Sequence, residues 1–181
     1  LDRSGRPRDL PPQIPLTRLS KQMAAPVVND RGSRSHVQTL GLRVATASDD
    51  NTAMLWDAAT GNPLTVFRGH RSNVILVALS SDGRRVATGG YDGTARVWDA
   101  STGKELMQIF SIDAVRALTF SPDARRLAII GGTGTVRLWN VESGNQVGVL
   151  PGWGEKIGEA ALAPDGSYLA ASSGGRVDVF A

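Results

Sequence analysis

Few residues in this sequence combine a side-chain type and a spacing that could do chemistry. The chain has no cysteine, which rules out disulfides, thiolate metal sites and cysteine nucleophiles. The run Gly131–Gly134 resembles part of a phosphate-binding loop, but it lacks the Lys and the helix that follow such a loop, so a plain hairpin turn is favoured. The run Asp49–Asn51 could suggest Ca²⁺, yet the wider series of acidic ligands is missing. We therefore expect no metal and no cofactor.

Composition and charge describe a soluble globular protein with a basic N-terminal segment. Of 181 residues, 41% are hydrophobic, the mean hydropathy is −0.13, and no apolar run has the roughly 18 residues of a membrane span. Residues 1–40 hold seven Lys or Arg and three Asp or Glu, so the net charge of +3 originates there. We expect a solvated tail, no membrane and no nucleic acid as partner, and the cytoplasm as the default compartment.

A tryptophan recurs at a fixed period and indicates a repeat protein. Trp56, Trp98 and Trp139 are continued by Phe180, at spacings of 42, 41 and 41 residues. Turn glycines keep the same period at Gly61, Gly103 and Gly144. A fixed period just above forty residues is typical of propellers and other repeat architectures.

Each period predicts four short antiparallel strands. In the best example, strands are expected at 74–79, 85–89, 94–99 and 104–110, separated by Asp-Gly and Thr-Gly turns that supply the positive φ hairpins need. The first of these runs is almost wholly apolar and therefore needs cover on both faces. Radial stacking of four-stranded sheets meets that need, so the fold class predicted is an all-β propeller.

The chain divides into a leader and a repeat region. Residues 1–36 hold five of the nine prolines and predict a flexible Pro- and Arg-rich leader, with 25–29 as one short strand. Residues 37–181 form the repeats. Val37 to Val44 spans 7 residues where Val74 to Val86 spans 12, so we expect the first repeat to have lost most of its innermost strand and turn. The repeat boundaries predicted are 37–68, 69–110, 111–152 and 153–181.

The dipeptides Gly69-His70 and Trp98-Asp99 together resemble one complete WD40 repeat. Trp56-Asp57 ends the repeat before it and Trp139-Asn140 the repeat after it. The resemblance covers residues 37–181 and implies a partial arc of about four propeller blades. Because such propellers usually close with about seven blades, the chain is expected to be the C-terminal part of a larger propeller. Open ends of the arc would promote self-association.

The resemblance also implies a buried hydrogen-bonded set of His, Ser or Thr, Asp and Trp in each repeat. The second repeat supplies all four, the first supplies three, and in the third Ile129 and Thr133 replace the Thr and the Asp. We expect the losses to occur together, because a half-satisfied buried network is costly. The predicted set is His70, Thr88, Asp92 and Trp98 in the second repeat, with Thr46, Asp50 and Trp56 in the first.

A catalytic interpretation of the His70–Asp92 pair is weaker than a structural one. A carboxylate-oriented imidazole can act as a general base. No nucleophile shares the register of both residues, however, and the structural role also accounts for Thr88 and Trp98. We therefore expect no enzymatic activity.

The function that the resemblance implies is a non-catalytic scaffold for protein or peptide partners. The alternative is a regulatory or sensor fragment of a multidomain enzyme, such as a WD40-linked kinase or protease. Tyr91 is the first candidate anchor, against the alternative that its ring only covers the turn. The other candidates for the partner-binding surface are Arg71, Asn73, Asp49 and Asp113.

Overall fold

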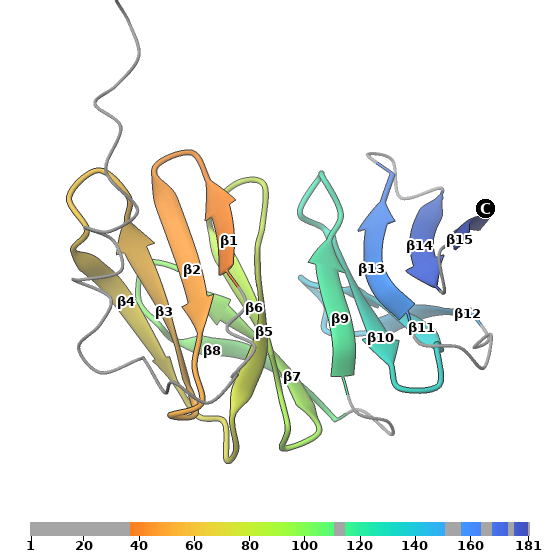
Figure 1. The fold of residues 1–181 in the computed structure, drawn as a ribbon, viewed down its shortest axis with the longest axis horizontal. Coiled ribbons are helices and arrows are strands. Elements are labelled where there is room, and N and C mark those ends of the chain that lie inside the picture. The colour runs from red at the N-terminus through yellow and green to blue at the C-terminus, as the bar shows by residue number, and fades with distance from the viewer. Residues whose placement is uncertain (1–36, 111–114, 151–156, 164–167, 174–175, 181) are drawn as a thin grey trace, which may run out of the picture.

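The computed structural model describes residues 37–110, 115–150, 157–163, 168–173 and 176–180 (Figure 1). The strand expected at 25–29 and the candidate surface residue Asp113 lie outside these ranges. Within them every regular element is a β-strand, and no helix is present that could cross a membrane.

In the described ranges, fifteen strands form four antiparallel sheets, in each of which the strands follow one another in chain order. The first three sheets have four strands and the last has three. The first sheet contains β1 (Val37–Leu40), β2 (Arg43–Ala47), β3 (Thr52–Asp57) and β4 (Pro63–Arg68). The second contains β5 (Val74–Leu79), β6 (Arg85–Gly90), β7 (Thr94–Asp99) and β8 (Glu105–Phe110). The third contains β9 (Val115–Phe120), β10 (Arg126–Gly131), β11 (Val136–Asn140) and β12 (Gln146–Leu150), and the fourth β13 (Ile157–Leu162), β14 (Leu169–Ser173) and β15 (Arg176–Phe180).

The sheets stand side by side with their first strands adjacent, so that β1, β5, β9 and β13 follow one another across the molecule (Figure 1). This is the arrangement of a partial β-propeller, as the sequence predicted. The run Gly131–Gly134 begins at the last residue of β10 and continues into the turn of the hairpin that β10 forms with β11.

The residue after each repeating Trp closes the next hairpin. Asp99 follows Trp98, and its Oδ1 accepts hydrogen bonds from the backbone N–H groups of Ser101 at 3.0 Å and Thr102 at 2.8 Å. The side-chain hydroxyls of Ser101 and Thr102 also donate to this carboxylate, and together these donors lower the pKa of Asp99 to about 2. Gly103 then adopts a φ of 73°, which a residue with a side chain rarely adopts. The period of the turn glycines thus has a local cause.

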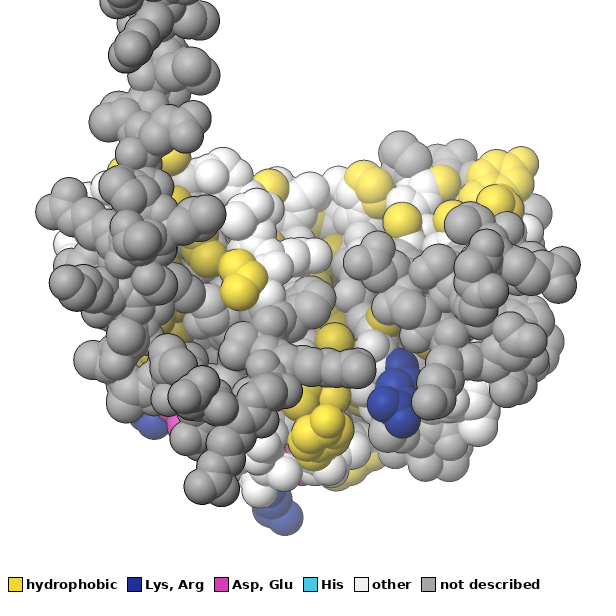
Figure 2. Space-filling view, viewed as in Figure 1, with side chains coloured by type: hydrophobic (Ala, Val, Ile, Leu, Met, Phe, Trp, Pro, Cys, Tyr) yellow, Lys and Arg dark blue, Asp and Glu magenta, His cyan; other side chains and the backbone are white. Residues whose placement is uncertain are grey.

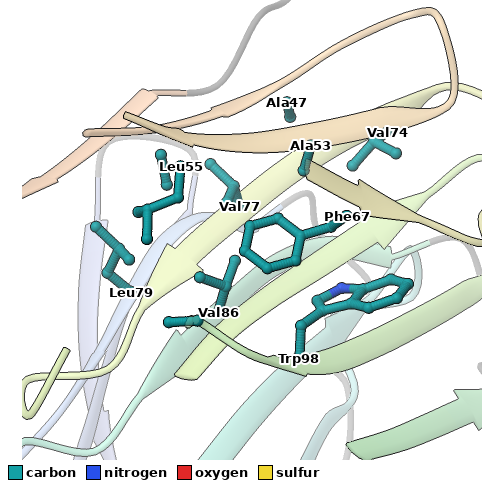
Figure 3. Packing of buried hydrophobic residues seen from close by; sticks show 11 residues of the cluster. Ala47, Ala53, Leu55, Phe67, Val74, Val77, Leu79, Val86 and Trp98 are labelled. Carbon is teal, nitrogen blue, oxygen red and sulfur yellow. The ribbon is translucent and has the colours of Figure 1, made fainter. Parts of the chain in front are cut away.

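Hydrophobic side chains fill the space between neighbouring sheets. Between the first and second sheets, Phe67 and Trp98 lie with ring centroids 5.8 Å apart, and Leu55, Val77 and Val86 pack around them (Figure 3). Comparable clusters join the second sheet to the third and the third to the fourth. Because strands are covered on both faces, the apolar first strand of the second repeat is buried as expected.

The expectation that the first repeat has lost most of its innermost strand was wrong. β1 retains four residues, Val37–Leu40, and pairs with β2 along its whole length. A turn of only two residues, Gly41 and Leu42, joins the two strands, and Gly41 has a φ of 56°. The missing residues are therefore accommodated by a shorter strand and a tighter turn, and the sheet keeps four strands.

Candidate functional site

The four residues predicted for the second repeat come together on the two central strands of the second sheet and at the turn that joins them. His70 lies in the connection from β4 to β5, Thr88 in β6, Asp92 in the β6–β7 turn and Trp98 in β7. His70 Nδ1 lies 3.0 Å from Asp92 Oδ2, and His70 Nε2 lies 2.7 Å from Thr88 Oγ1. Trp98 Nε1 donates to the same hydroxyl at 2.8 Å. A continuous hydrogen-bonded chain thus runs from the core to the turn.

The donors and acceptors of this chain are consistent with a neutral imidazole. Trp98 is a donor only, so Thr88 Oγ1 accepts from it and can direct its own proton to His70 Nε2. His70 Nδ1 then carries the ring proton and donates to Asp92. Burial lowers the pKa of His70 below its usual value, even though the hydrogen bond to Asp92 and the charge of that carboxylate act in the opposite direction.

Asp92 is the acceptor on which the network converges. Burial by itself would raise its pKa, but the carboxylate accepts hydrogen bonds from the backbone N–H groups of Arg71 at 2.8 Å and Thr94 at 3.0 Å. The Thr94 hydroxyl, at 2.8 Å, and His70 donate as well. Together these donors lower the pKa of Asp92 to about 2. The anion therefore holds the β4–β5 connection and the β6–β7 turn in one arrangement.

Three members of the network were not predicted. Besides Thr94, Arg96 is buried in β7 and donates through Nε to Thr94 Oγ1 at 3.3 Å. Its Nη1 pairs with Glu105 Oε2 at 2.6 Å. One signal for Thr94 was present in the sequence: an Asp followed two residues later by Thr recurs at Asp50 and Thr52.

Two glycines leave the space that the network occupies. A Cβ at Gly90 would lie 2.6 Å from His70 Nδ1 and 2.9 Å from Asp92 Oδ1. A Cβ at Gly69 would lie 2.8 Å from Arg96 Nη1. Real Cβ atoms do not approach other atoms so closely, so a side chain at Gly90 would displace the His70 ring and one at Gly69 would displace the Arg96 guanidinium.

The first sheet forms the corresponding contacts that its residues allow. Trp56 Nε1 donates to Thr46 Oγ1 at 2.9 Å. Asp50 Oδ1 accepts from the backbone N–H of Thr52 at 2.9 Å and from its hydroxyl at 2.6 Å. The structure therefore reproduces both ends of the set, the Trp–Thr pair and the Asp turn. Residue Asp49, beside this turn, is half-buried.

The third sheet keeps the repeating Trp but not the residues that form the network with it in the second sheet. Ile129 occupies the place of the Thr, yet the Trp remains as Trp139. The indole Nε1 of Trp139 is buried and has no hydrogen-bond partner among the described residues. At the turn, Thr133 replaces the Asp, and its hydroxyl lies 3.1 Å from that of Thr135. The retained indole of Trp139 is thus left without the hydroxyl acceptor that the first two sheets supply.

The Thr88–His70–Asp92 order has the connectivity of a hydroxyl–imidazole–carboxylate triad, but access is lacking. Thr88 is 0% exposed and His70 7%. The Thr88 oxygen also accepts the indole hydrogen of Trp98, which covers it from the side of the first sheet. A nucleophile must reach the reacting atom of a substrate, and this hydroxyl cannot do so in the observed packing. The geometry supports a structural role, in which the network holds the β4–β5 connection against the β6–β7 turn.

The candidate surface residues of the second repeat surround this network. Tyr91 is 63% exposed, and its backbone N–H donates to the carbonyl of Asn73 at 2.9 Å. Arg71 is exposed, while Asn73 is half-buried. The sequence did not single out Phe110, which ends β8 and is 76% exposed. Its strand, β8, is the outermost strand of the second sheet.

Comparison with known proteins identifies the repeats. The family model described as "WD domain, G-beta repeat" matches residues 29–57, 61–99 and 104–140, which is more than half of the chain. No curated protein gave a significant match to the chain. The second matched range contains the whole His70, Thr88, Asp92 and Trp98 set.

Proposed function

Because the chain belongs to the WD40 repeat family, whose fold is a protein-interaction scaffold, we propose that it binds protein or peptide partners without catalysing a reaction. The binding face we propose is formed by the β4–β5 connection and the β6–β7 turn, with Tyr91 as the anchor. The observation that carries the proposal is that Tyr91 is exposed directly beside the buried network.

The physical argument is preorganisation. Tyr91 is held at its own backbone and through the next side chain, since its N–H donates to the carbonyl of Asn73 and the carboxylate of Asp92 accepts from the backbone N–H of Arg71. An aromatic side chain on a rigid support loses little conformational freedom when a partner covers it. Tyr is enriched among the residues that contribute most to binding.

The experiment is a peptide-display selection on the immobilised full chain, followed by affinity measurement of the selected peptides by fluorescence polarisation. Tyr91→Ala should weaken binding by about tenfold or more, whereas Tyr168→Ala, which removes an exposed tyrosine from the fourth sheet, should have little effect. Unchanged affinity of every selected peptide for the Tyr91→Ala protein would show that this face is not the binding site.

A further inference from the structure

The first sheet has one face against which no described sheet packs. Side chains alternate between the two faces of a strand. Leu55 of β3 and Phe67 of β4 lie on the face toward the second sheet, in the cluster that contains Trp98. Trp56, next to Leu55, therefore lies on the opposite face. Because the first sheet stands at one end of the row (Figure 1), this opposite face is named the end face.

Side chains at the centre of the end face are nevertheless buried. Trp56 is 4% exposed, and its cross-strand partner Val44 is 7% exposed. Thr46, whose hydroxyl accepts the indole hydrogen of Trp56, is buried as well. Neither Trp56 nor Val44 belongs to the three clusters that described hydrophobic side chains form between the sheets. Their cover within this single chain therefore comes from residues outside the described ranges.

The distribution of exposure indicates that the cover is narrow. On the same face, Val37 of β1 is 51% exposed and Thr39 is exposed, although they pair directly with Thr46 and Val44. Hydrophobic side chains are visible over the first sheet, left of centre in Figure 2. Neighbouring sheets meet along their first strands, so a further sheet from a second copy would cover β1. An extended segment across β2 and β3 covers Trp56 and leaves β1 exposed.

The second sheet shows how one strand can provide such cover. Phe67, in the outermost strand of the preceding sheet, packs against Trp98. The second and third ranges matched by the family model begin at residues 61 and 104, just before the outermost strands β4 and β8. The first matched range begins at residue 29, eight residues before β1. By the same pattern, the chain ahead of β1 is the segment that covers Trp56.

Length and composition agree with this assignment. Among the ranges that the structure does not describe, residues 1–36 alone are long enough to cross a sheet face, since each of the others has at most six residues. Residues 29–36 are polar or glycine, and Met23–Val28 is the uncharged run nearest to β1. Eight extended residues span about 26 Å, more than the width of about 15 Å of a four-stranded sheet. The run can therefore reach β2 and β3.

We propose that the end face of the first sheet is a docking site for the chain's own N-terminal segment, with Met23–Val28 packed on Trp56 and Val44. The segment takes the place of a neighbouring sheet and keeps this apolar surface from water. Composition alone favoured a solvated tail for the same residues. With the end face occupied, a second copy cannot pack on the centre of the first sheet, which limits self-association at this end of the row.

The first test identifies the occupant by photo-cross-linking of the full chain. The sequence has no cysteine, so Thr39→Cys supplies a single thiol for a benzophenone label at an exposed position opposite Val44. The expected product joins β1 to the peptide that contains Met23–Val28 of the same molecule, as a mixture of isotope-labelled and unlabelled protein shows. Ser143→Cys, exposed in the β11–β12 turn, is the control and should not give this product. Cross-links only to other peptides, or only between molecules, would overturn the proposal.

The second test measures how fast a thiol reagent modifies Val44→Cys. The rate should be lower than that of Val37→Cys, on the same face, by about tenfold or more. Val27→Asp places a charge in the contact and should raise the rate at Val44→Cys by about tenfold or more. Ile14→Asp, the same kind of change in the uncharged run 10–16, should not. Val97→Cys, buried between the second and third sheets, should remain protected beside Val27→Asp, which verifies that the sheets stay folded.

Two results of the second test would overturn the proposal. One is a Val44→Cys thiol that reacts as fast as Val37→Cys, because the end face would then be open to water. The other is a Val44→Cys rate that is the same with and without Val27→Asp, or that rises with Ile14→Asp instead, because the cover would then not be Met23–Val28.

Discussion

Replacing Thr88 by Val tests whether the buried network stabilises the fold. Val has nearly the shape of Thr, so the change removes the hydroxyl without leaving a cavity. Trp98 Nε1 loses its acceptor and His70 Nε2 loses its partner, at positions with no access to water. A buried donor left unsatisfied costs about 1–3 kcal/mol, and a typical hydrogen bond contributes about 1 kcal/mol. The added methyl group offsets less than about 1 kcal/mol, so the expected loss is about 2–3 kcal/mol.

The assay is urea unfolding of the full chain, followed by circular dichroism and by tryptophan fluorescence. Thr119→Val is the control, because Thr119 is half-buried in β9 and donates only a long 3.3 Å bond to the carbonyl of Phe120. It should change the free energy of unfolding by less than about 0.5 kcal/mol. The reasoning is refuted if Thr88→Val stays within that limit, or if the two variants are destabilised equally.

Three further changes follow from the same contacts. Because burial lowers the pKa of His70, the unfolded chain binds a proton more readily than the folded one, so stability should fall as the pH drops from about 6.5 through the lower folded pKa. Urea midpoints at successive pH values measure this pH dependence, and it should be weaker in His70→Gln. An unchanged pH dependence in His70→Gln would show that other groups cause it. Ile129→Thr should be more stable than Ile129→Val by about 1 kcal/mol, because only the hydroxyl can accept from Trp139 Nε1; equal urea midpoints would contradict this. Gly90→Ala should lower the free energy of unfolding by about 2–4 kcal/mol, since its Cβ would meet His70 Nδ1. Gly148→Ala, whose Cβ would have its nearest neighbour 3.5 Å away, should lower it by less than about 1 kcal/mol. Similar melting temperatures of the two variants would argue against the close contact at Gly90.

Much of the fold could be predicted from the sequence because its cause is local. Asp99 binds backbone groups of the next few residues, and Gly103 adopts the positive φ that ends the same turn. Such turns recur with the period of the repeat and separate the strands, so the strand order follows the chain. The first repeat was the exception. The short interval in the sequence predicted that the first strand of this repeat was mostly lost, but a two-residue turn at Gly41 leaves room for the strand β1.

The candidate site was predicted only in part. His70, Thr88, Asp92 and Trp98 could be named because the family resemblance assigns each a position, and the structure brings all four together. Arg96 could not be named, because an Arg in a strand is ordinarily expected at the surface and here is buried against Glu105.

The sequence by itself determined the repeat, the strands and the turns, since these depend on residues close to one another in the chain. Only the tertiary structure decided which side chains share a network and which are left out of it. Among the described residues the indole Nε1 of Trp139 has no hydrogen-bond partner, because Ile129, on the neighbouring strand, offers no oxygen. Phe110 is exposed at the end of the outermost strand of its sheet, while its neighbour Ile109 on the same strand is buried. Contacts of this kind join different strands and sheets, and the local pattern of residues does not specify them.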